Sequence, residues 1–182
     1  MKKSILVAIF IVVACVQLAV PASRIVLREY VLQTGTEFRF RTAPVDPADF
    51  FRGRYVALGF SSDSVTNDTP NEFTPGQSVY ALITEDTNGF ARVSAITAEK
   101  PTGNNFFKTH VRYSHRSSVR FEYPFTRFYM KETLAPQAET AYRDAIRRTN
   151  NAPTYITVRV KMGLAVIEEL YIEGTPVKEY LQ

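Results

Sequence analysis

Residues 5–23 have the sequence ILVAIFIVVACVQLAVPAS, an apolar run that is interrupted before its end only by Gln17. At ~1.5 Å per residue such a run forms a helix of about 30 Å, which matches the hydrocarbon core of a bilayer. A helix of this length on a water-soluble domain would carry a polar face, and this run has none. The run therefore predicts a single membrane-spanning helix followed by a soluble domain.

Three roles are open for this run, and we expect the first, an uncleaved signal anchor over residues 1–23. The second is a cleavable signal peptide that is cut before Ser23, after the small residues at 20–22. Pro21 lies next to this cut and apolar residues resume beyond it, which weighs against cleavage. The third is a lipoprotein signal that ends at Cys15, but the chain stays apolar well past that residue.

Charged residues on both sides of the run bear on its orientation. Lys2 and Lys3 precede it, whereas Arg24 and Arg28 follow it. Basic residues favour the cytoplasmic side of a membrane, so the first pair favours a cytoplasmic N-terminus and the second pair weakens that bias. With so short a segment before the span, we expect a signal anchor that places residues 24–182 outside the cytoplasm.

The composition excludes several classes of protein. The 182 residues suffice for one ordinary domain beside an anchor, and 45% hydrophobic with 22% charged residues is normal globular usage. One cysteine allows no disulfide within the chain, and His110 and His115 would face opposite sides of a regular strand. Lys2 and Lys3 supply two of the four net positive charges. We therefore expect no metal, no cofactor and no nucleic-acid partner.

The soluble part is expected to begin with a stalk or linker over residues 24–36, in which Gly35 ends a helix. Residues 37–182 are then expected to form one domain. This domain should contain one main helix that begins near Pro136 and ends near Arg148, because apolar residues recur there at helical spacing. The fold class that follows is α+β, with a membrane helix followed by a β-rich, mostly antiparallel domain.

Residues 37–41 alternate strictly between polar and apolar side chains. This pattern predicts a strand that turns Phe38 and Phe40 toward the core and Arg39 and Arg41 toward water or a partner.

Other strands are expected where similar patterns lie between turn residues, at 54–60, 77–84, 90–97, 106–113, 119–123, 125–130, 155–162 and 164–172. In the strand at 106–113, Tyr113 should share a face with Val111. Asn88-Gly89 should supply positive φ angles to a hairpin turn. The polar residues 61–76 predict a loop, and residues 46–53 predict a short helix with Asp46 as its cap.

A segment near the start of the domain resembles the signature of the GDYXXLXY family, in residues Gly53-Arg54-Tyr55-Val56-Ala57-Leu58-Gly59-Phe60. The N-terminal span, residues 127–129 and residues 170–174 support the resemblance. It implies a bacterial, single-span protein of the inner (cytoplasmic) membrane, with a multi-pass membrane protein as its partner. Arg54 stands where the motif has Asp and Phe60 where it has Tyr. The resemblance supplies no catalytic residues.

Local groups of reactive residues carry little catalytic signal. Ser61, His110 and Asp63 could be combined into a hydrolytic triad, but no nucleophile elbow surrounds the serine. Asp63, Asn67 and Asp68 lack the spaced carboxylates of a calcium loop. A cell-envelope hydrolase of peptidase type is nevertheless kept as the alternative function.

A cluster of arginines offers the best candidate contact surface. Arg39, Arg41, Arg52 and Arg54 lie close together in the sequence, with Tyr55 beside them. Arginine suits bidentate contacts with carboxylates and phosphates. The competing interpretation is a solvated strand face with local ion pairs. We expect a membrane-anchored, extracytoplasmic accessory domain that binds a membrane-protein partner through these residues, without catalysis.

Overall fold

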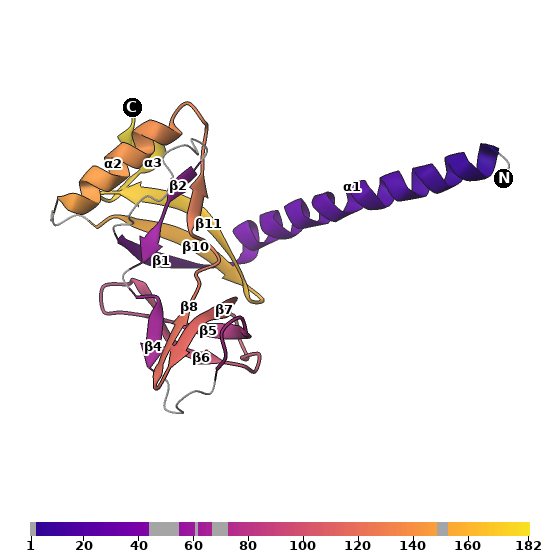
Figure 1. The fold of residues 1–182 in the computed structure, drawn as a ribbon. Helices are drawn as coiled ribbons and strands as arrows, with labels where there is room; N and C mark the ends of the chain where they lie inside the picture. Colours follow the sequence, from indigo (N-terminus) through magenta and orange to yellow (C-terminus); the bar gives the residue numbers. More distant parts are fainter. Residues whose placement is uncertain (1–2, 44–54, 61, 67–72, 149–152) are drawn as a thin grey trace.

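The computed structural model describes residues 3–43, 55–60, 62–66, 73–148 and 153–182, and these form one long helix and an α+β domain (Figure 1). The fold class expected from the sequence is confirmed. All pairings between its named strands are antiparallel. The expected short helix at 46–53 lies outside the described residues.

The long helix α1 comprises Lys3–Thr34 and projects away from the domain (Figure 1). It is long and apolar enough to cross a membrane, and none of its most apolar window is buried against the domain. Its last turns continue as the expected helical stalk, in which Val31 is only 1% exposed. The backbone N–H of Gly35 donates to the Val31 carbonyl oxygen at 2.8 Å, and β1 begins at the next residue.

The first sheet has the strand order β12-β11-β10-β1-β3. Its strands are Thr175–Pro176 (β12), Leu164–Ile172 (β11), Tyr155–Lys161 (β10), Thr36–Ala43 (β1) and Gly59–Phe60 (β3). The alternation predicted in β1 is confirmed, because Phe38 and Phe40 are buried whereas Arg39 and Arg41 are exposed.

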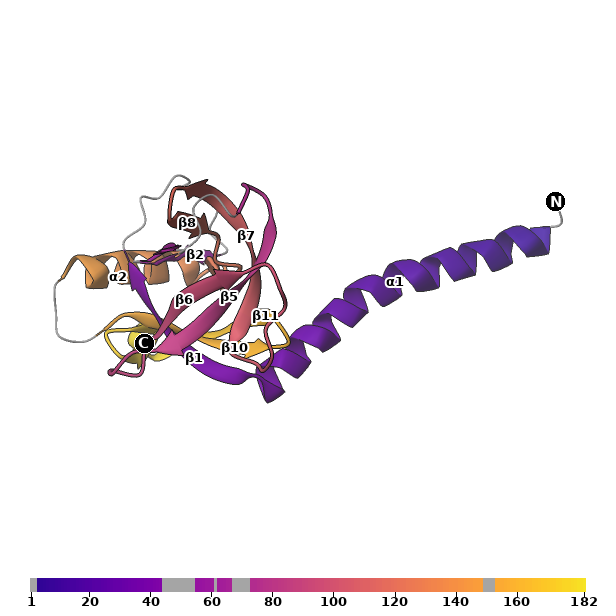
Figure 2. The ribbon, with the colours of Figure 1, turned by 90° about the horizontal axis from the view of Figure 1, so that it is seen from below.

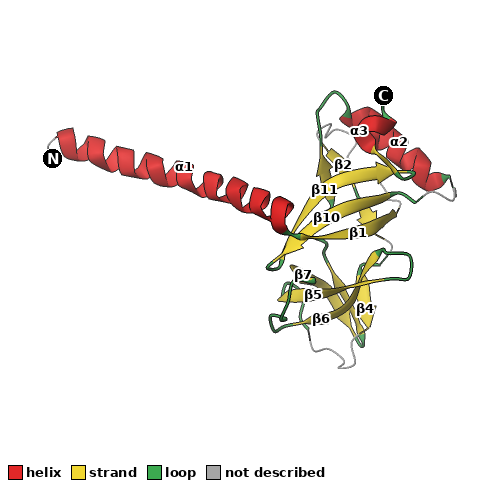
Figure 3. Ribbon diagram, turned by 180° about the vertical axis from the view of Figure 1, so that it is seen from behind, coloured by secondary structure: helices red, strands yellow, loops and turns green. Residues whose placement is uncertain are grey.

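The second five-stranded sheet has the order β4-β8-β7-β5-β6. Its strands are Ser64–Thr66 (β4), Ser118–Phe121 (β8), Phe106–His115 (β7), Ser78–Glu85 (β5) and Ala91–Thr97 (β6). Figure 3 shows it packed below the first sheet, at the end away from α2.

One face assignment in β7 was wrong. Its register against β8 shifts between Val111 and Tyr113, so two residues of β7 oppose one residue of β8. Such a bulge reverses the alternation of faces. Tyr113 is consequently 53% exposed instead of buried. The strand is not regular, and His110 and His115 are both exposed.

The strand expected at 54–60 is two strands in two different sheets. Tyr55–Ala57 (β2) pairs with Arg127–Tyr129 (β9), whereas Gly59 and Phe60 pair with β1. The chain changes partner at Leu58, whose backbone N–H donates to the Thr126 carbonyl oxygen at 2.9 Å. Val56 and Leu58 are both buried, as alternating faces of one strand would place them, but such alternation carries no information on which neighbour each half pairs with.

The prediction of a plain loop at 61–76 was also wrong. Ser64–Thr66 forms the edge strand β4 against β8, and Val65 and Phe73 are buried. Two isolated apolar residues are too few to give the alternating pattern that predicts a strand. This segment becomes a strand because it pairs with β8.

The helix α2 comprises Ala135–Arg147 and covers the first sheet together with the short helix α3, Val177–Tyr180 (Figure 3). It buries the apolar stripe at Ala135, Ala138, Tyr142 and Ala145, as the helical spacing predicted. Figure 2, viewed from below, shows the two sheets stacked beside the end of α1. The core between them is aromatic.

Candidate functional site

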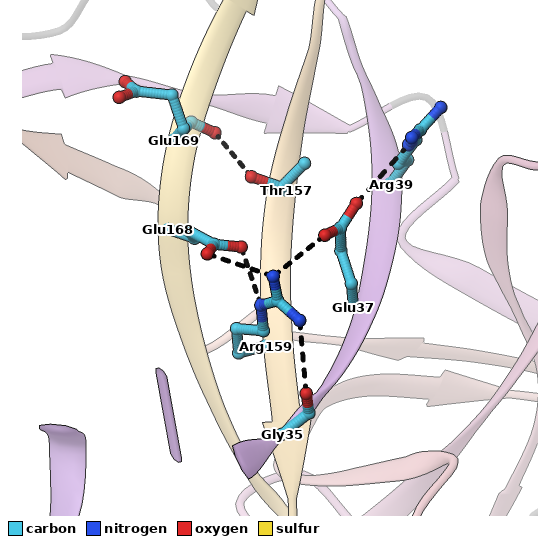
Figure 4. Close-up of polar contacts among 7 residues, drawn as sticks. All are labelled: Gly35, Glu37, Arg39, Thr157, Arg159, Glu168 and Glu169. Atoms are coloured by element: carbon cyan, nitrogen blue, oxygen red, sulfur yellow. Dashed lines mark hydrogen bonds and ion pairs between the residues drawn. The ribbon is translucent and has the colours of Figure 1, made fainter. Parts of the chain in front are cut away.

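The solvent-facing side of β1, β10 and β11 carries a network of ion pairs centred on Arg159 (Figure 4). The Nε of Arg159 donates to Glu168 at 2.7 Å, and its Nη2 donates to Glu168 at 3.1 Å and to Glu37 at 3.0 Å. Its Nη1 donates to the Gly35 carbonyl oxygen at 3.4 Å. The hydrogen bonds to Glu168 raise the pKa of Arg159. This arginine therefore ties the start of β1 to β10 and β11.

Arg39 lies at the rim of this network. Its Nε is 3.6 Å from Glu37, and its side chain is 56% exposed. An exposed ion pair at this distance contributes little to stability, about 0–1 kcal/mol. The guanidinium is therefore accessible for a partner, although Glu37 also contacts Arg159.

Arg41 belongs to a row of stacked side chains. Its guanidinium carbon is 4.2 Å from the ring centroid of Phe90, and Phe90 meets Tyr155 edge to face at 5.5 Å. Tyr155 stacks on Tyr171 at 4.7 Å. Since Phe90 directly precedes β6, Arg41 joins the first sheet to the hairpin of the second.

Tyr55 lies elsewhere, on β2. Its ring is 5.7 Å from the ring of Tyr129, and the Arg127 guanidinium is 5.2 Å from its centroid. The sequence neighbours Arg52 and Arg54 lie outside the described residues. The structure therefore does not bring Tyr55 together with Arg39 and Arg41, and the role of all five in binding stays a prediction.

A pocket of about 410 Å³ lies beside Tyr129, between α1, β9, β11, α3 and the start of α2. We call it the stalk pocket. Its charged lining is Arg28, Arg127, Lys131, Lys178 and Glu168, and its apolar lining is Phe128, Tyr129, Met130, Leu134, Ile167 and Leu181. An adjacent hollow of about 230 Å³ shares Arg28, Arg127, Tyr129 and Ile167 with it.

The charges in the stalk pocket are unbalanced. Among the described residues that line it, Glu168 has the only acidic side chain, and Arg159 already engages it. Lys178 is 3.6 Å from Glu169, but its side chain is 68% exposed. Arg28, Arg127 and Lys131 have no recorded ion pair with any other residue that the structure describes. The described lining of the pocket therefore combines an excess of positive charge with apolar side chains.

The sequence did not reveal this pocket. Its lining comes from parts of the chain that are far apart in the sequence, between Arg28 and Gln182, and the sequence indicated only a strand and a family resemblance for residues 127–129. The one local signal is the pair Arg24 and Arg28, four residues apart on one side of the stalk.

Of the residues considered for hydrolysis, Asp63 and His110 share no hydrogen bond or ion pair within the part of the chain that the structure describes. Asp63 is 3.6 Å from Arg120, His110 lies on the exposed face of β7, and Ser61 lies outside the described residues. His115 stacks on Tyr113 at 6.2 Å. Within the described ranges, no three His, Cys, Asp or Glu side chains are grouped to hold a metal.

The signature segment lies at the junction of the sheets. Val56 and Leu58 are buried, and Phe60 packs 4.2 Å from the ring of Tyr123. The described part of the motif is thus mainly structural, with Tyr55 beside the stalk pocket.

Comparisons with curated proteins and with solved structures give no match. The family model described as "GDYXXLXY protein" matches residues 17–170, from inside α1 to within β11. The chain therefore belongs to the GDYXXLXY family.

Proposed function

We propose that this protein is a membrane-anchored accessory domain that stands outside the cytoplasm and binds a multi-pass protein of the same membrane, without catalysis. The observation that carries the proposal is the attachment of α1, an exposed apolar helix that runs directly into a strand of the domain. Such an attachment fixes the domain at the membrane surface.

The contacts at the end of α1 make this attachment firm. The Nζ of Lys161, in β10, donates to the Thr34 hydroxyl at 2.8 Å and lies 4.5 Å from the ring centroid of Tyr30. Val31 is buried, and Arg159 donates to the carbonyl oxygen of Gly35. Two side chains of β10, Lys161 and Arg159, thus hold the last turn of the helix and the glycine that follows it.

A partner in the same membrane needs only a modest contact surface. Anchoring two proteins in one membrane raises their effective concentration, so a weak interface is populated. Arg39 is our first contact candidate among the described residues. Its side chain is exposed, and it contacts the ion-pair network only at the rim, through Glu37. Arg41 is the second, although its stacking on Phe90 gives it a structural role as well.

The test is affinity capture of the tagged full-length protein from its native membranes in mild detergent, with mass spectrometry of the co-purified proteins. We expect a stoichiometric multi-pass partner, and we expect Arg39→Ala to reduce its recovery severalfold with little change in melting temperature. Arg112→Ala, which removes an exposed arginine from β7, is the matched control.

Two results would contradict the proposal. If the capture experiment recovers the anchored protein alone, the proposed membrane-protein partner is contradicted. A large fall in the melting temperature of Arg39→Ala, with capture per folded protein unchanged, would make Arg39 a structural residue.

A further inference from the structure

We propose that the stalk pocket binds the headgroup and upper acyl chains of one anionic phospholipid from the membrane that anchors the protein. The inference relies on the anchoring proposed above, but it does not depend on a protein partner. Three properties of the pocket carry it: its charge, the height of its residue Arg28 above the span, and its apolar lining.

The charge of the pocket fits a phosphate. Arg28 comes from α1, whereas Arg127 and Lys131 come from residues 127–131, and all three line one cavity without an ion pair to any carboxylate of the described residues. Converging cations repel one another, so such an arrangement favours an anion between them. The fork of a guanidinium matches phosphate oxygens in two directions.

The height of Arg28, which lines the pocket, fits a lipid headgroup. Arg28 lies five residues beyond Ser23, where the apolar run ends, which corresponds to about 7.5 Å along a helix. The headgroup layer on each side of the hydrocarbon core is about 5–8 Å thick. Arg28 therefore reaches the level of lipid phosphates when α1 spans a bilayer, and Arg24 lies one turn below it on the same side.

The apolar lining of the pocket fits an acyl chain. Leu134, Ile167 and Leu181 line the same cavity as the cations. A volume of about 410 Å³ lies in the range of sites that hold small ligands. A free phosphate ion would leave this apolar surface uncovered, so the complementary ligand is an amphiphile with an anionic head.

The experiment is a titration of the full-length protein in non-ionic detergent with phosphatidylglycerol or phosphatidylcholine of identical chains, followed by native mass spectrometry. We expect one phosphatidylglycerol to bind at least tenfold more tightly than phosphatidylcholine. Each cation close to an anionic lipid contributes about fivefold in affinity, so the double variant Arg28→Gln with Lys131→Gln should lose about 25-fold. Arg112→Gln is the control and should bind as the wild type does.

A competition arm separates a lipid from a free anion. Inorganic phosphate and glycerophosphoglycerol, which is the headgroup without chains, should not displace the lipid at equal concentration. Displacement by either compound would overturn the lipid assignment, as would equal binding of the two lipids or unchanged binding by the double variant. Arg127→Lys, which keeps the charge but loses the fork, should bind less tightly and confirms the site if the double variant is unstable.

The two proposals can fail separately. Loss of lipid selectivity overturns only the role of the stalk pocket, because Arg39 lies outside its lining. Failure to capture a partner overturns only the accessory role.

Discussion

Asp86 closes the β5–β6 hairpin with its side chain. Its Oδ1 accepts the backbone N–H of Asn88 at 2.8 Å and that of Phe90 at 2.9 Å. The sequence predicted positive φ angles for Asn88 and Gly89, but only Gly89 has one, at 74°. The turn is thus stabilised in part by the Asp86 carboxylate, and not by a positive φ angle at Asn88. Such a turn also presents Phe90 to Arg41.

The titration of Asp86 makes this turn sensitive to acid. The hydrogen bond from Phe90 lowers the pKa of Asp86 in the folded state. Its stabilisation is therefore complete above the unfolded pKa of about 3.9 and is lost as the pH falls through the folded pKa. Asp86→Asn keeps an acceptor but does not titrate. We expect the melting temperatures of wild type and Asp86→Asn to converge from pH 6 to pH 2, whereas parallel curves would show that the carboxylate contributes no stability.

At the scale of elements, the junction of α1 with β1 is tight. A Cβ added to Gly35 would lie 2.5 Å from the Val31 carbonyl oxygen and 3.1 Å from the backbone nitrogen of Val160. These neighbours are backbone atoms of the helix and of β10, and they cannot rotate away. Only glycine allows the helix to end this close to the sheet.

Gly35→Ala should therefore be costly. We expect a loss of about 2–3 kcal/mol in the free energy of unfolding, because the helix end or β10 must shift. Thermal unfolding of the purified full-length protein measures this. Gly103→Ala is the control for backbone strain alone, because its Cβ would meet nothing within 4 Å and its positive φ of 95° should cost about 1–2 kcal/mol. An equal loss in both variants would contradict a special role for the junction.

Elements with many alternating residues were predicted well, and short elements were not. The hairpin of β10 and β11 follows from long apolar alternation around Gly163. The edge strand β4 and the pair β12 and α3 contain too few apolar residues to form a pattern. Their conformation depends on neighbours such as β8 that are distant in sequence, so local spacing cannot predict it.

At the scale of the molecule, an aromatic cluster joins the two large sheets. The ring of Tyr123 lies 4.2 Å from Phe60 and 6.0 Å from Phe40 of the first sheet. It also lies 5.0 Å from Phe121 and 5.9 Å from Phe107 of the second sheet. Its hydroxyl donates to the Ser62 carbonyl oxygen at 2.7 Å. Tyr123 therefore stabilises the contact between the sheets.

Burial of Tyr123 predicts a weakness at high pH. Burial and the nearby charge of Asp63 raise the pKa of Tyr123 above its unfolded value of about 10. Because the unfolded state ionises first, its contribution to stability is complete below pH 10 and decreases as the pH rises beyond it. Tyr123→Phe should cost about 1–2 kcal/mol at pH 7 by leaving the Ser62 carbonyl without its donor. Denaturant midpoints at pH 8–11 should decline less for this variant, and an identical decline would contradict the prediction.

The candidate site was less predictable than the fold for a physical reason. Arg39 and Arg41 are neighbours in one strand, so alternation alone placed them on one exposed face. The cations of the stalk pocket come from α1, β9, α3 and the segment before α2. These cations come close together only in the folded molecule. They are not spaced at a helix or strand period in the sequence, so periodicity could not predict the pocket.

The direct passage from α1 into β1 has a consequence for motion within the plane of the membrane. The contacts at Gly35 couple the helix to the domain. A rotation of the helix about its own axis therefore turns the domain through the same angle. Inserting one residue into the stalk would turn the domain by about 100° and raise it by ~1.5 Å. Inserting seven residues, about two helical turns, would nearly restore the orientation of the domain about the helix axis and would move it along that axis by about 10 Å. The length of the helical stalk therefore sets both the orientation of the domain about the helix axis and its distance from the apolar run.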